Sequence, residues 1–499
     1  MGKISYSDHV KKSDISVVIA EIIFQSLKKT HKILPLSKVV DTSSGGTPRR
    51  TNQSYYSGDI PWLKSGEMND SLISQAEEFI TEEGLNNSSA KIFPKGTLLV
   101  AMYGATAGKT GILDIDASTN QAVCAVTPKD KSTNRDFLFW FFRANRFYFI
   151  DISRGGAQPN ISQSVIGNTD FPIVEDKLQK NIALFLSNLE QTKEADYSLI
   201  PLDLCQPVKL AFDYLSCLQK LEYENKNQIN IVSKLKQAIL QEAIAGQLTA
   251  EWRTENPMQK GNPETDAIAL LAKIKGFWEE HKTRYQKLSF KGYKNGQTID
   301  KSEVDSSWIN TNIDSIGIVK VGSTPSRTNP KYWNGRINWI SSGEVANNII
   351  THSNECITDI ALKEASLYPC PAGTVLVAMI GQGKTRGQSS ILQIESTTNQ
   401  NVAAIIIDHG YINSKYLWYF FLSRYLKTRQ IATGGNQPAL NSVKIGCISF
   451  PLPPLAEQKA IVEKVDKLMN IIDQLEQQIK HRKQLAEDLM QTVLREAFE

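Results

Sequence analysis

The chain has 499 residues, which is too long for one ordinary hydrophobic core, so we expect two or more domains. Hydrophobic residues make up 41% and charged residues 22% of the chain, and no stretch approaches the roughly 20 apolar residues of a membrane span, so we expect a soluble protein. The 56 basic and 52 acidic side chains leave a net charge of only +4. This charge permits nucleic-acid binding without demonstrating it.

The first predicted element is a helical segment in residues 1–30. Apolar residues from Ile15 to Leu27 fit one face of a helix, and Glu21 and Gln25 interrupt the run, so it does not resemble a secretory signal. The six cysteines form no CxxC pair and the six histidines form no HxH or HxxxH pair, which argues against a metal site or a disulfide framework. A reducing cytoplasm is the simplest setting.

Two copies of one domain follow each other in the chain. The block GGTPRRTNQSYYSGDIPWLKSGE from Gly45 is matched by VGSTPSRTNPKYWNGRINWISSGE from Val321. The run GTLLVAMYG from Gly96 is matched by GTVLVAMIG from Gly373, and GGAQPNIS is matched by GGNQPALN. Such self-similarity predicts a duplicated architecture. We assign residues 31–174 to the first copy and residues 308–453 to the second.

Each copy mixes short β-rich runs with a helix-like aromatic segment. The run from Thr97 to Met102 is typical of a buried strand, and clusters of Gly, Pro, Asn and Ser mark the turns. Aromatic helix-like segments extend from Phe137 to Phe149 and from Tyr416 to Tyr425. Each copy is therefore predicted to be an α/β (α+β) domain.

Long helices follow both copies, in a central spacer (residues 175–253) and at the C-terminus (residues 454–499). Apolar residues alternate there at spacings of four and three, as in a coiled-coil seam. The predicted seam positions are Leu218, Leu221, Asn225, Gln228, Val232, Leu235 and Ile239 in the first helix and Ile461, Val465, Leu468, Ile472, Leu475 and Ile479 in the second. Helices from Val208 to Leu248 and from Pro454 to Phe498 would each be roughly 60 Å long and would pair antiparallel.

Two features around these helices leave alternatives open. Each helix could instead pack on its own domain as an end-piece, because similar patterns occur in ordinary bundles. The segment from Asp196 to Pro207 is predicted to break the first helical region. Residues 254–307 are predicted to be a linker with one short amphipathic helix, from Asp266 to His281.

The order of these motifs resembles that of type I restriction-modification specificity (S) subunits across nearly the whole chain. The resemblance is carried by the repeated GGTPxR to SGE block, the GTLLVAM strand, LKQAILQEAIAGQLTAEWR from Leu235 and FPLPPLAEQKAIVEKVDKLM from Phe450. The first helical entry departs from the pattern, because FPIVED from Phe171 lacks the PPLAEQ run.

The resemblance implies two target-recognition domains that each read one half of a split double-stranded DNA site. It implies helices that set the gap between the halves and that dock two modification subunits, which carry S-adenosylmethionine. Two restriction (motor-nuclease) subunits, which use ATP and Mg²⁺, would join this complex. The chain itself would hold no cofactor or metal, would not be an enzyme and would act in the cytoplasm.

Candidate DNA-contact residues are the loop Arg and Lys side chains suited to guanine or phosphate, the Asn and Gln side chains suited to adenine, and hydroxyl groups. In the first copy these are Arg49, Arg50, Asn52, Ser65, Lys109, Thr110, Gln158 and Asn160. In the second copy they are Arg327, Asn329, Lys331, Ser342, Lys384, Arg386, Gln388 and Gln437. Residues that both copies share, such as Trp62 and Trp339 and the two Ser-Gly-Glu triplets, are predicted to hold the fold, because the two domains should read different bases.

Two enzyme hypotheses fit the sequence poorly. The run GATAGKT from Gly104 has three residues between its glycines where a phosphate loop has four, and the counterpart from Gly381 has only one. The polar-Pro-Pro-aromatic motif of amino-methyltransferases is missing, since Leu455 follows the chain's one Pro-Pro pair. Asp59 is matched by Arg336, which argues against a duplicated acidic nuclease site at that position.

Three hypotheses therefore remain: a DNA specificity subunit without an active site, a DNA-binding enzyme that acts alone, and a protein-interaction adaptor that binds no nucleic acid. Cofactor uptake by the purified chain would distinguish the second. Sequence-selective DNA binding with a steep salt dependence would exclude the third.

Overall fold

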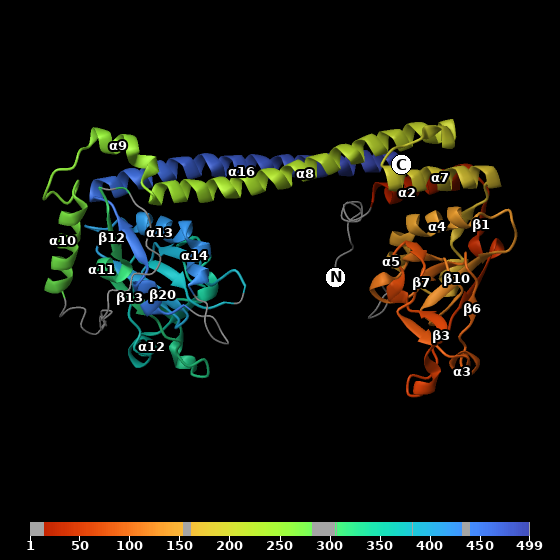
Figure 1. Cartoon of the computed structure of the whole chain (residues 1–499), viewed down its shortest axis with the longest axis horizontal. Helices are drawn as coiled ribbons and strands as arrows, with labels where there is room; N and C mark the ends of the chain where they lie inside the picture. Colours follow the sequence, from red (N-terminus) through yellow and green to blue (C-terminus); the bar gives the residue numbers. More distant parts are fainter. Residues whose placement is uncertain are drawn as a thin grey trace. The chain divides into compact units, whose positions relative to one another are not determined.

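The computed structural model describes residues 14–152, 161–281, 305, 307–381, 383–431 and 440–498. The chain divides into two compact units, which we call unit 1 (Met1–Asn225 with His481–Glu499) and unit 2 (Lys226–Lys480). Each unit contains one copy of the repeated domain and part of both long helices (Figure 1). Within the described residues, no helix is both long and apolar enough to cross a membrane.

Unit 1 is built on a five-stranded sheet with the order β2-β10-β7-β8-β4 and a four-stranded sheet with the order β5-β3-β9-β6. The first sheet contains β2 (Val40–Ser44), β4 (Ser71–Ile73), β7 (Leu98–Ala101), β8 (Thr110–Leu113) and β10 (Val123–Pro128). The second contains β3 (Tyr56–Leu63), β5 (Glu78–Ile80), β6 (Ile92–Phe93) and β9 (Ala117–Thr119). A separate antiparallel ladder pairs β1 (Ile33–Pro35) with β11 (Asp170–Pro172).

Unit 2 repeats the topology of the five-stranded sheet and, within the described residues, has one strand fewer in its smaller sheet. Its five-stranded sheet has the order β13-β20-β17-β18-β15, strand for strand the counterpart of the sheet in unit 1. Its strands are β13 (Gly317–Val321), β15 (Ile349–Ile350), β17 (Val375–Ala378), β18 (Ser389–Leu392) and β20 (Val402–Ile407). The smaller sheet has the order β16-β14-β19, with β14 (Trp333–Ile340), β16 (Glu355–Ile357) and β19 (Thr397–Thr398), and β12 (Ile309–Asn312) pairs with β21 (Ser449–Leu452). The duplication read from the sequence is therefore confirmed.

Both faces of the central strand are buried in each unit. Side chains alternate across a strand, so Leu98 and Val100 of β7 enter one hydrophobic cluster and Leu99 and Ala101 enter another. Strand β17 divides its residues between two clusters in the same way. A strand covered on both faces needs an unbroken apolar run, which explains the repeated GTLLVAM and GTVLVAM segments.

The helices of each domain lie around its sheets. In unit 1 these are α2 (Ile15–Thr30), α3 (Glu82–Asn86), α4 (Arg135–Ala144), α5 (Arg146–Ile152), α6 (Gln163–Gly167) and α7 (Asp176–Thr192). In unit 2 they are α9 (Ala250–Glu255), α10 (Ala267–Glu280), α11 (Ile313–Ile316), α12 (Asp359–Glu364), α13 (Ser414–Ser423), α14 (Tyr425–Gln430) and α15 (Ser442–Gly446). Helices α2, α4 and α7 contact one another, and α4 also contacts β7 and β8.

Helix α2 is buried on more sides than the single apolar face that the sequence predicted. Every residue from Ile15 to Phe24 is buried, and the Phe24 ring lies 4.8 Å from Phe137 and 5.5 Å from Phe141 of α4, centroid to centroid. A helix that is apolar all round is a core helix. Helix α2 therefore belongs to the core of the first domain.

The aromatic segments are also divided more finely than predicted. In unit 1 the segment splits into α4 and α5 at Asn145, whose side-chain amide donates to Phe141 O at 2.7 Å and whose Oδ1 accepts from Lys28 Nζ at 3.1 Å. In unit 2, α13 ends at Ser423 and α14 begins at Tyr425. Asparagine ends α4 because its short amide competes for the carbonyls of the last turn.

The two long helices are α8 (Leu202–Ile244) and α16 (Leu455–Phe498). In unit 2 they run antiparallel, because Lys236 forms ion pairs with Asp473 at 2.9 Å and Glu476 at 3.0 Å, whereas Lys464 Nζ donates to Leu248 O at 3.0 Å. In unit 1, Asn225 of α8 is buried and its Oδ1 accepts from Arg482 of α16. The antiparallel coiled coil is confirmed.

The bounds of the break before α8 and two of the seam positions were predicted wrongly. Helix α8 begins at Leu202 and continues through Pro207, so the break is shorter than the predicted segment from Asp196. This proline removes a donor near the helix start only, where solvent can satisfy the freed carbonyl. The predicted seam residues Leu235 and Leu475 are 44% and 41% exposed, because the helix pair faces the domain core through neighbouring positions.

Candidate nucleic-acid interface

A glycine-containing loop follows the central strand of the larger sheet in each domain. In unit 1 the residue that fixes this loop (residues 103–109) is Asp70, whose backbone adopts φ 63°. The Asp70 carboxylate accepts from Thr110 N and from Thr110 Oγ1, both at 2.9 Å. Arg146 of α5 forms an ion pair with Asp70, and its Nε donates to Gly108 O at 3.1 Å. The loop is thereby tied both to α5 and to β4.

The charge of Arg146 decides the ionisation of Asp70. Burial acts to raise the pKa of this carboxyl, but Arg146 and the hydrogen bonds from Thr110 outweigh it and hold the pKa below its ordinary value. The same loop is joined to the Ser-Gly-Glu triplet, because Thr106 Oγ1 donates to Ser65 O at 2.8 Å.

The loop of unit 2 (residues 381–388) is held by neutral and basic groups. Asn347, at φ 57°, takes the place of the acid, and its Oδ1 accepts from Ser389 N at 3.0 Å. From α14, Tyr425 donates its hydroxyl to Lys384 O at 2.6 Å, and Arg429 Nη1 donates to Gly383 O at 2.7 Å. The two domains thus hold corresponding loops with groups of different charge.

Basic residues lie in the loop of the second domain and on the helices α14 and α15. Lys384 lies in the loop, Lys427 and Arg429 lie on α14, and Lys444 of α15 donates to Ile431 O at 3.3 Å, directly after α14. We call these four basic residues the basic edge. The chain has no Asp or Glu from residue 365 to 394 or from residue 409 to 456, so the segments that form this edge contribute no carboxylate. A surface of this kind suits a polyanion.

Arg50 and Arg327 are repeat counterparts with the same fixed surroundings. Arg50 pairs with Glu78 at 2.7 Å, and its guanidinium carbon lies 4.7 Å from the centroid of the Tyr56 ring. Arg327 pairs with Glu355 and lies 4.0 Å from the Trp333 centroid.

Both arginine side chains are about half exposed, at 52% and 54%. Their hydrogen bonds, together with their charge, lower the pKa of the partner carboxyl groups, Glu78 and Glu355. Each domain therefore presents one pre-oriented guanidinium.

Several other predicted contact residues have local structural roles. The side chains of Asn52 and Asn329 accept from Ser54 N and Lys331 N, both at 3.1 Å, and cap short 3-10 helices (η2, Gln53–Tyr55; η8, Pro330–Tyr332). Thr110 is fully buried with its hydroxyl bonded to Asp70, which corrects its prediction as a DNA contact. This hydroxyl is also the one that a phosphate-loop hypothesis would need for Mg²⁺.

The remaining predicted residues have varied surroundings. Arg49, Lys331 and Lys384 are exposed, whereas Ser65, Lys109, Ser342, Arg386 and Gln388 are partly buried. Gln158, Asn160 and Gln437 lie outside the described residues.

The shared triplets and tryptophans hold the fold, as predicted. Trp62 Nε1 donates to Gly46 O at 2.9 Å, and Trp339 Nε1 donates to Ser323 O at 3.0 Å. In each triplet, which forms a 3-10 helix (η3, Ser65–Glu67; η9, Ser342–Glu344), the glutamate accepts from the backbone N–H three residues earlier.

The sequence reasoning missed Arg146, Tyr425 and Arg429, which orient the loops. The segment without acidic residues between Asp408 and Glu457 is the signal that could have indicated the second loop's surroundings.

Two copies of one mixed domain, each with a loop bonded to a neighbouring helix and each attached to paired long helices, are the architecture of a two-domain binding protein. The chain belongs to the type I restriction modification DNA specificity domain family, whose model matches residues 28–196 and 305–482. Its role is DNA sequence recognition in a type I restriction-modification system.

Individual relatives agree with this assignment. The chain is 21% identical over 486 residues to the type I restriction enzyme MjaIX specificity subunit of Methanocaldococcus jannaschii, covering 94% of this chain and 93% of that protein. It is 26% identical over 219 residues to the EcoR124I/EcoR124II specificity subunit of Escherichia coli, covering 43% and 53%. A chain from a solved structure concerning complex assembly and conformational transition of the type I R-M system superposes with a TM-score of 0.50 at 12% identity, covering 94% and 97%, and so shares the fold.

Proposed function

We propose that each domain reads one half of a split DNA site and that the paired helices set the gap between the halves. The observation that carries DNA contact is the basic edge, in which Lys384 of the loop, Lys427 and Arg429 of α14 and Lys444 of α15 lie in segments free of acidic residues. Phosphate contacts of this kind fix the register of a protein on the duplex, and base contacts then specify the sequence.

The first domain contacts DNA through a smaller set of charges. Lys109 lies in the counterpart loop, and Arg49 is exposed beside the Arg50 guanidinium. Arg50 and Arg327 recur in both domains, which favours contacts to the sugar-phosphate backbone over contacts to bases. Base reading would then fall to loop residues that differ between the domains, such as Lys109 and Gln388.

The chain acts as a non-catalytic subunit of a cytoplasmic complex. Two modification subunits dock on its helices and supply S-adenosylmethionine for adenine methylation, and two restriction subunits supply ATP- and Mg²⁺-dependent cleavage. The family membership and the long helices support this proposal. No residue of this chain is assigned to a cofactor.

A base-resolution map of DNA methylation in the host, with and without the gene, tests the proposed function. Loss of methylation at one split motif in the deletion strain is the expected result and identifies both half-sites. If the neighbouring methyltransferase is expressed and no motif changes, the chain does not direct modification, and the lone-enzyme or adaptor hypothesis replaces this one.

The contact surface is tested by the salt dependence of DNA binding. Each lost phosphate contact flattens the slope of log K against log salt by about 0.9. The double variant Lys384→Ala/Lys427→Ala should therefore flatten the slope by roughly 2 on every sequence. Lys363→Ala, an exposed lysine on α12, is the matched control and should leave the slope unchanged. Equal slopes for the double variant and the wild type would contradict the basic edge as a DNA surface.

A further inference from the structure

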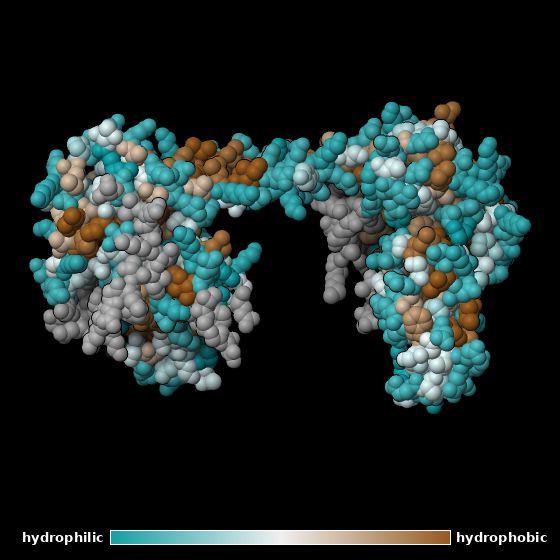
Figure 2. Space-filling model, viewed as in Figure 1, coloured by the Kyte–Doolittle hydropathy of each residue, from teal (hydrophilic) through white to brown (hydrophobic). Residues whose placement is uncertain are grey.

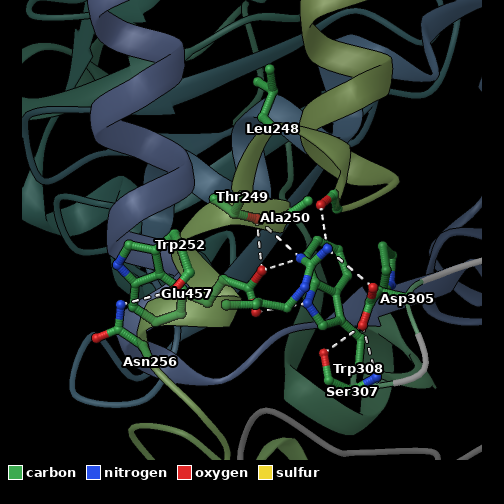
Figure 3. Close-up of polar contacts among 12 residues, drawn as sticks. Leu248, Thr249, Ala250, Trp252, Asn256, Asp305, Ser307, Trp308 and Glu457 are labelled. Atoms are coloured by element: carbon green, nitrogen blue, oxygen red, sulfur yellow. Dashed lines mark hydrogen bonds and ion pairs between the residues drawn. The ribbon is translucent and has the colours of Figure 1, made fainter.

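A buried cluster of polar side chains lies where α16 begins (Figure 3). Its centre is Glu457, in the first turn of α16, with only 1% of its surface exposed. The Oε1 atom of Glu457 accepts from Thr249 Oγ1 at 2.7 Å and from Arg253 Nη1 at 2.5 Å. The Oε2 atom accepts from Trp308 Nε1 at 2.8 Å. Three donors from outside the helix thus hold one carboxylate.

Arg253 of α9 extends the cluster to two more segments. Its Nη2 donates to Gly246 O, just after the end of α8, at 2.7 Å, and forms an ion pair with Asp305 at 3.0 Å. Asp305 in turn accepts from Ser307 N at 2.9 Å, which orders the chain before β12. The cluster therefore joins the end of α8, helix α9, the entry to the second domain and the start of α16, all within unit 2.

Gly246 allows these segments to approach closely. It adopts φ +80°, a conformation that ends α8 and that other residues adopt only with strain. A Cβ atom there would lie 3.1 Å from the Trp308 ring and 3.2 Å from Arg253 Nη1. The backbone turn at Gly246 therefore packs directly against Trp308 and Arg253 of the polar cluster.

Within the described residues of the first repeat, no such cluster anchors the helix. In both repeats a buried glutamine accepts from the N–H of a helix-capping asparagine, with Gln179 bound to Asn134 N and Gln458 to Asn413 N, both at 2.8 Å. These glutamines attach α7 and α16 to their domains. The position before Gln179 is Leu178, whereas the position before Gln458 is Glu457. The glutamine already provides the attachment common to both repeats, so the acid has a different role.

We propose that the Glu457 cluster is a positioning site that fixes the direction in which the second domain is held on its helix pair and thereby fixes the DNA spacer that the protein accepts. The inference rests on the proposed function as a reader of split sites. Glu457 and Arg253 are positioning residues, since neither is assigned a contact with DNA.

Directional bonds are needed because apolar packing alone would tolerate a small rotation. One added base pair moves a half-site by about 3.4 Å along the DNA axis and rotates it about that axis by roughly a tenth of a turn. The hydrophobic effect is non-directional, so this angle depends on the polar contacts between the domain and the helix pair. These contacts include the Lys415–Asp466 ion pair at 2.6 Å and the hydrogen bond from Asn413 N to Gln458 at 2.8 Å. Among these contacts, a buried carboxylate held by three donors resists rotation, because any rotation leaves polar groups unpaired away from water.

The test is spacer selectivity of the full chain in complex with its methyltransferase subunits. The site found by methylation mapping is rebuilt with the native spacer and with one base pair removed or added, and binding is measured for each duplex. We expect E457Q and R253M to reduce the preference for the native spacer by roughly tenfold. T374V is the matched control, because it removes one hydrogen bond of a buried side chain in the same domain, from Thr374 Oγ1 to Pro371 O at 2.8 Å, at a residue outside the cluster.

The outcomes separate the inference from the proposed function. If the wild type itself selects no split site, the proposed function fails and the spacer argument fails with it. If the wild type is selective and E457Q keeps the same spacer preference as T374V, the cluster is a fold anchor only and the inference is overturned. If E457Q does not fold, the variant D305N provides the test. It removes only the Arg253–Asp305 ion pair, in which the Asp305 side chain is 29% exposed. An unchanged spacer preference in D305N also overturns the inference.

Discussion

Replacing Asp70 by Asn tests how the loop of the first domain is held. Asparagine can still accept from Thr110, as Asn347 accepts from Ser389 in the second domain. The variant D70N loses the ion pair with Arg146, whose side chain is 22% exposed against 16% for Asp70. Hydrogen bonds to charged groups contribute about 1.5–3 kcal/mol, and partial exposure reduces this, so we expect a loss of about 1–2 kcal/mol.

The pH dependence of this loss follows from the lowered pKa of Asp70. Because the folded-state pKa lies below the unfolded value of about 3.9, the ion pair contributes its full stability above that value. The contribution is lost as the pH falls through the folded-state pKa. The difference in stability between wild type and D70N should therefore be constant from pH 7 to about 5 and should shrink below about 4.

Hydrogen exchange measured by mass spectrometry is the suitable assay, because a chain of two units need not unfold in one step. Faster exchange is expected in β7 and β8, with no change in their repeat counterparts β17 and β18, which serve as the internal control. Arg146→Met should show the same local effect, and the double variant should lose less than the sum of the two. A D70N effect below about 0.5 kcal/mol at pH 7, or one that persists unchanged at pH 3, would refute the reasoning.

Further predictions concern single positions. Asn225→Leu should lower the stability of the helix pair by about 1 kcal/mol, because it removes the buried acceptor of two hydrogen bonds from Arg482; an unaltered or raised melting temperature would contradict this. Gly322→Ala should prevent soluble expression or lower the melting temperature by several degrees, since its Cβ would lie 1.7 Å from Thr398 O, and a wild-type melting curve would show the contact to be relaxed. Arg327→Met should cost no more than about 1 kcal/mol in thermal unfolding, because its ion pair is half exposed; a larger loss would mean that the stacking on Trp333 dominates.

The duplicated architecture was readable from the chain alone. Matching blocks in the same order predicted two similar domains, and both five-stranded sheets have the same strand order. Local rules were sufficient there, because buried strands need continuous apolar runs and the turns need glycine and asparagine. The predicted linker helix from Asp266 to His281 differs by one residue at each end from α10 (Ala267–Glu280).

The candidate site was only partly predictable. The residue types suited to DNA were named correctly as a class, but sequence spacing could not show that Thr110 faces Asp70 inside the domain or that Arg50 pairs with Glu78. Such pairs join residues that are 40 and 28 positions apart. Helical periodicity likewise placed Leu235 in the seam, although the fold leaves it 44% exposed.

The sequence by itself determined the number of domains, their mixed class and the long helices, because each depends on periodicity and composition within a short window. The tertiary structure alone decided which polar groups meet. The Glu457 cluster brings Thr249 and Arg253 against a carboxylate more than 200 positions further along the chain. A buried charge is stable only where its partners converge in space, and that convergence follows from the folded backbone and not from any local pattern.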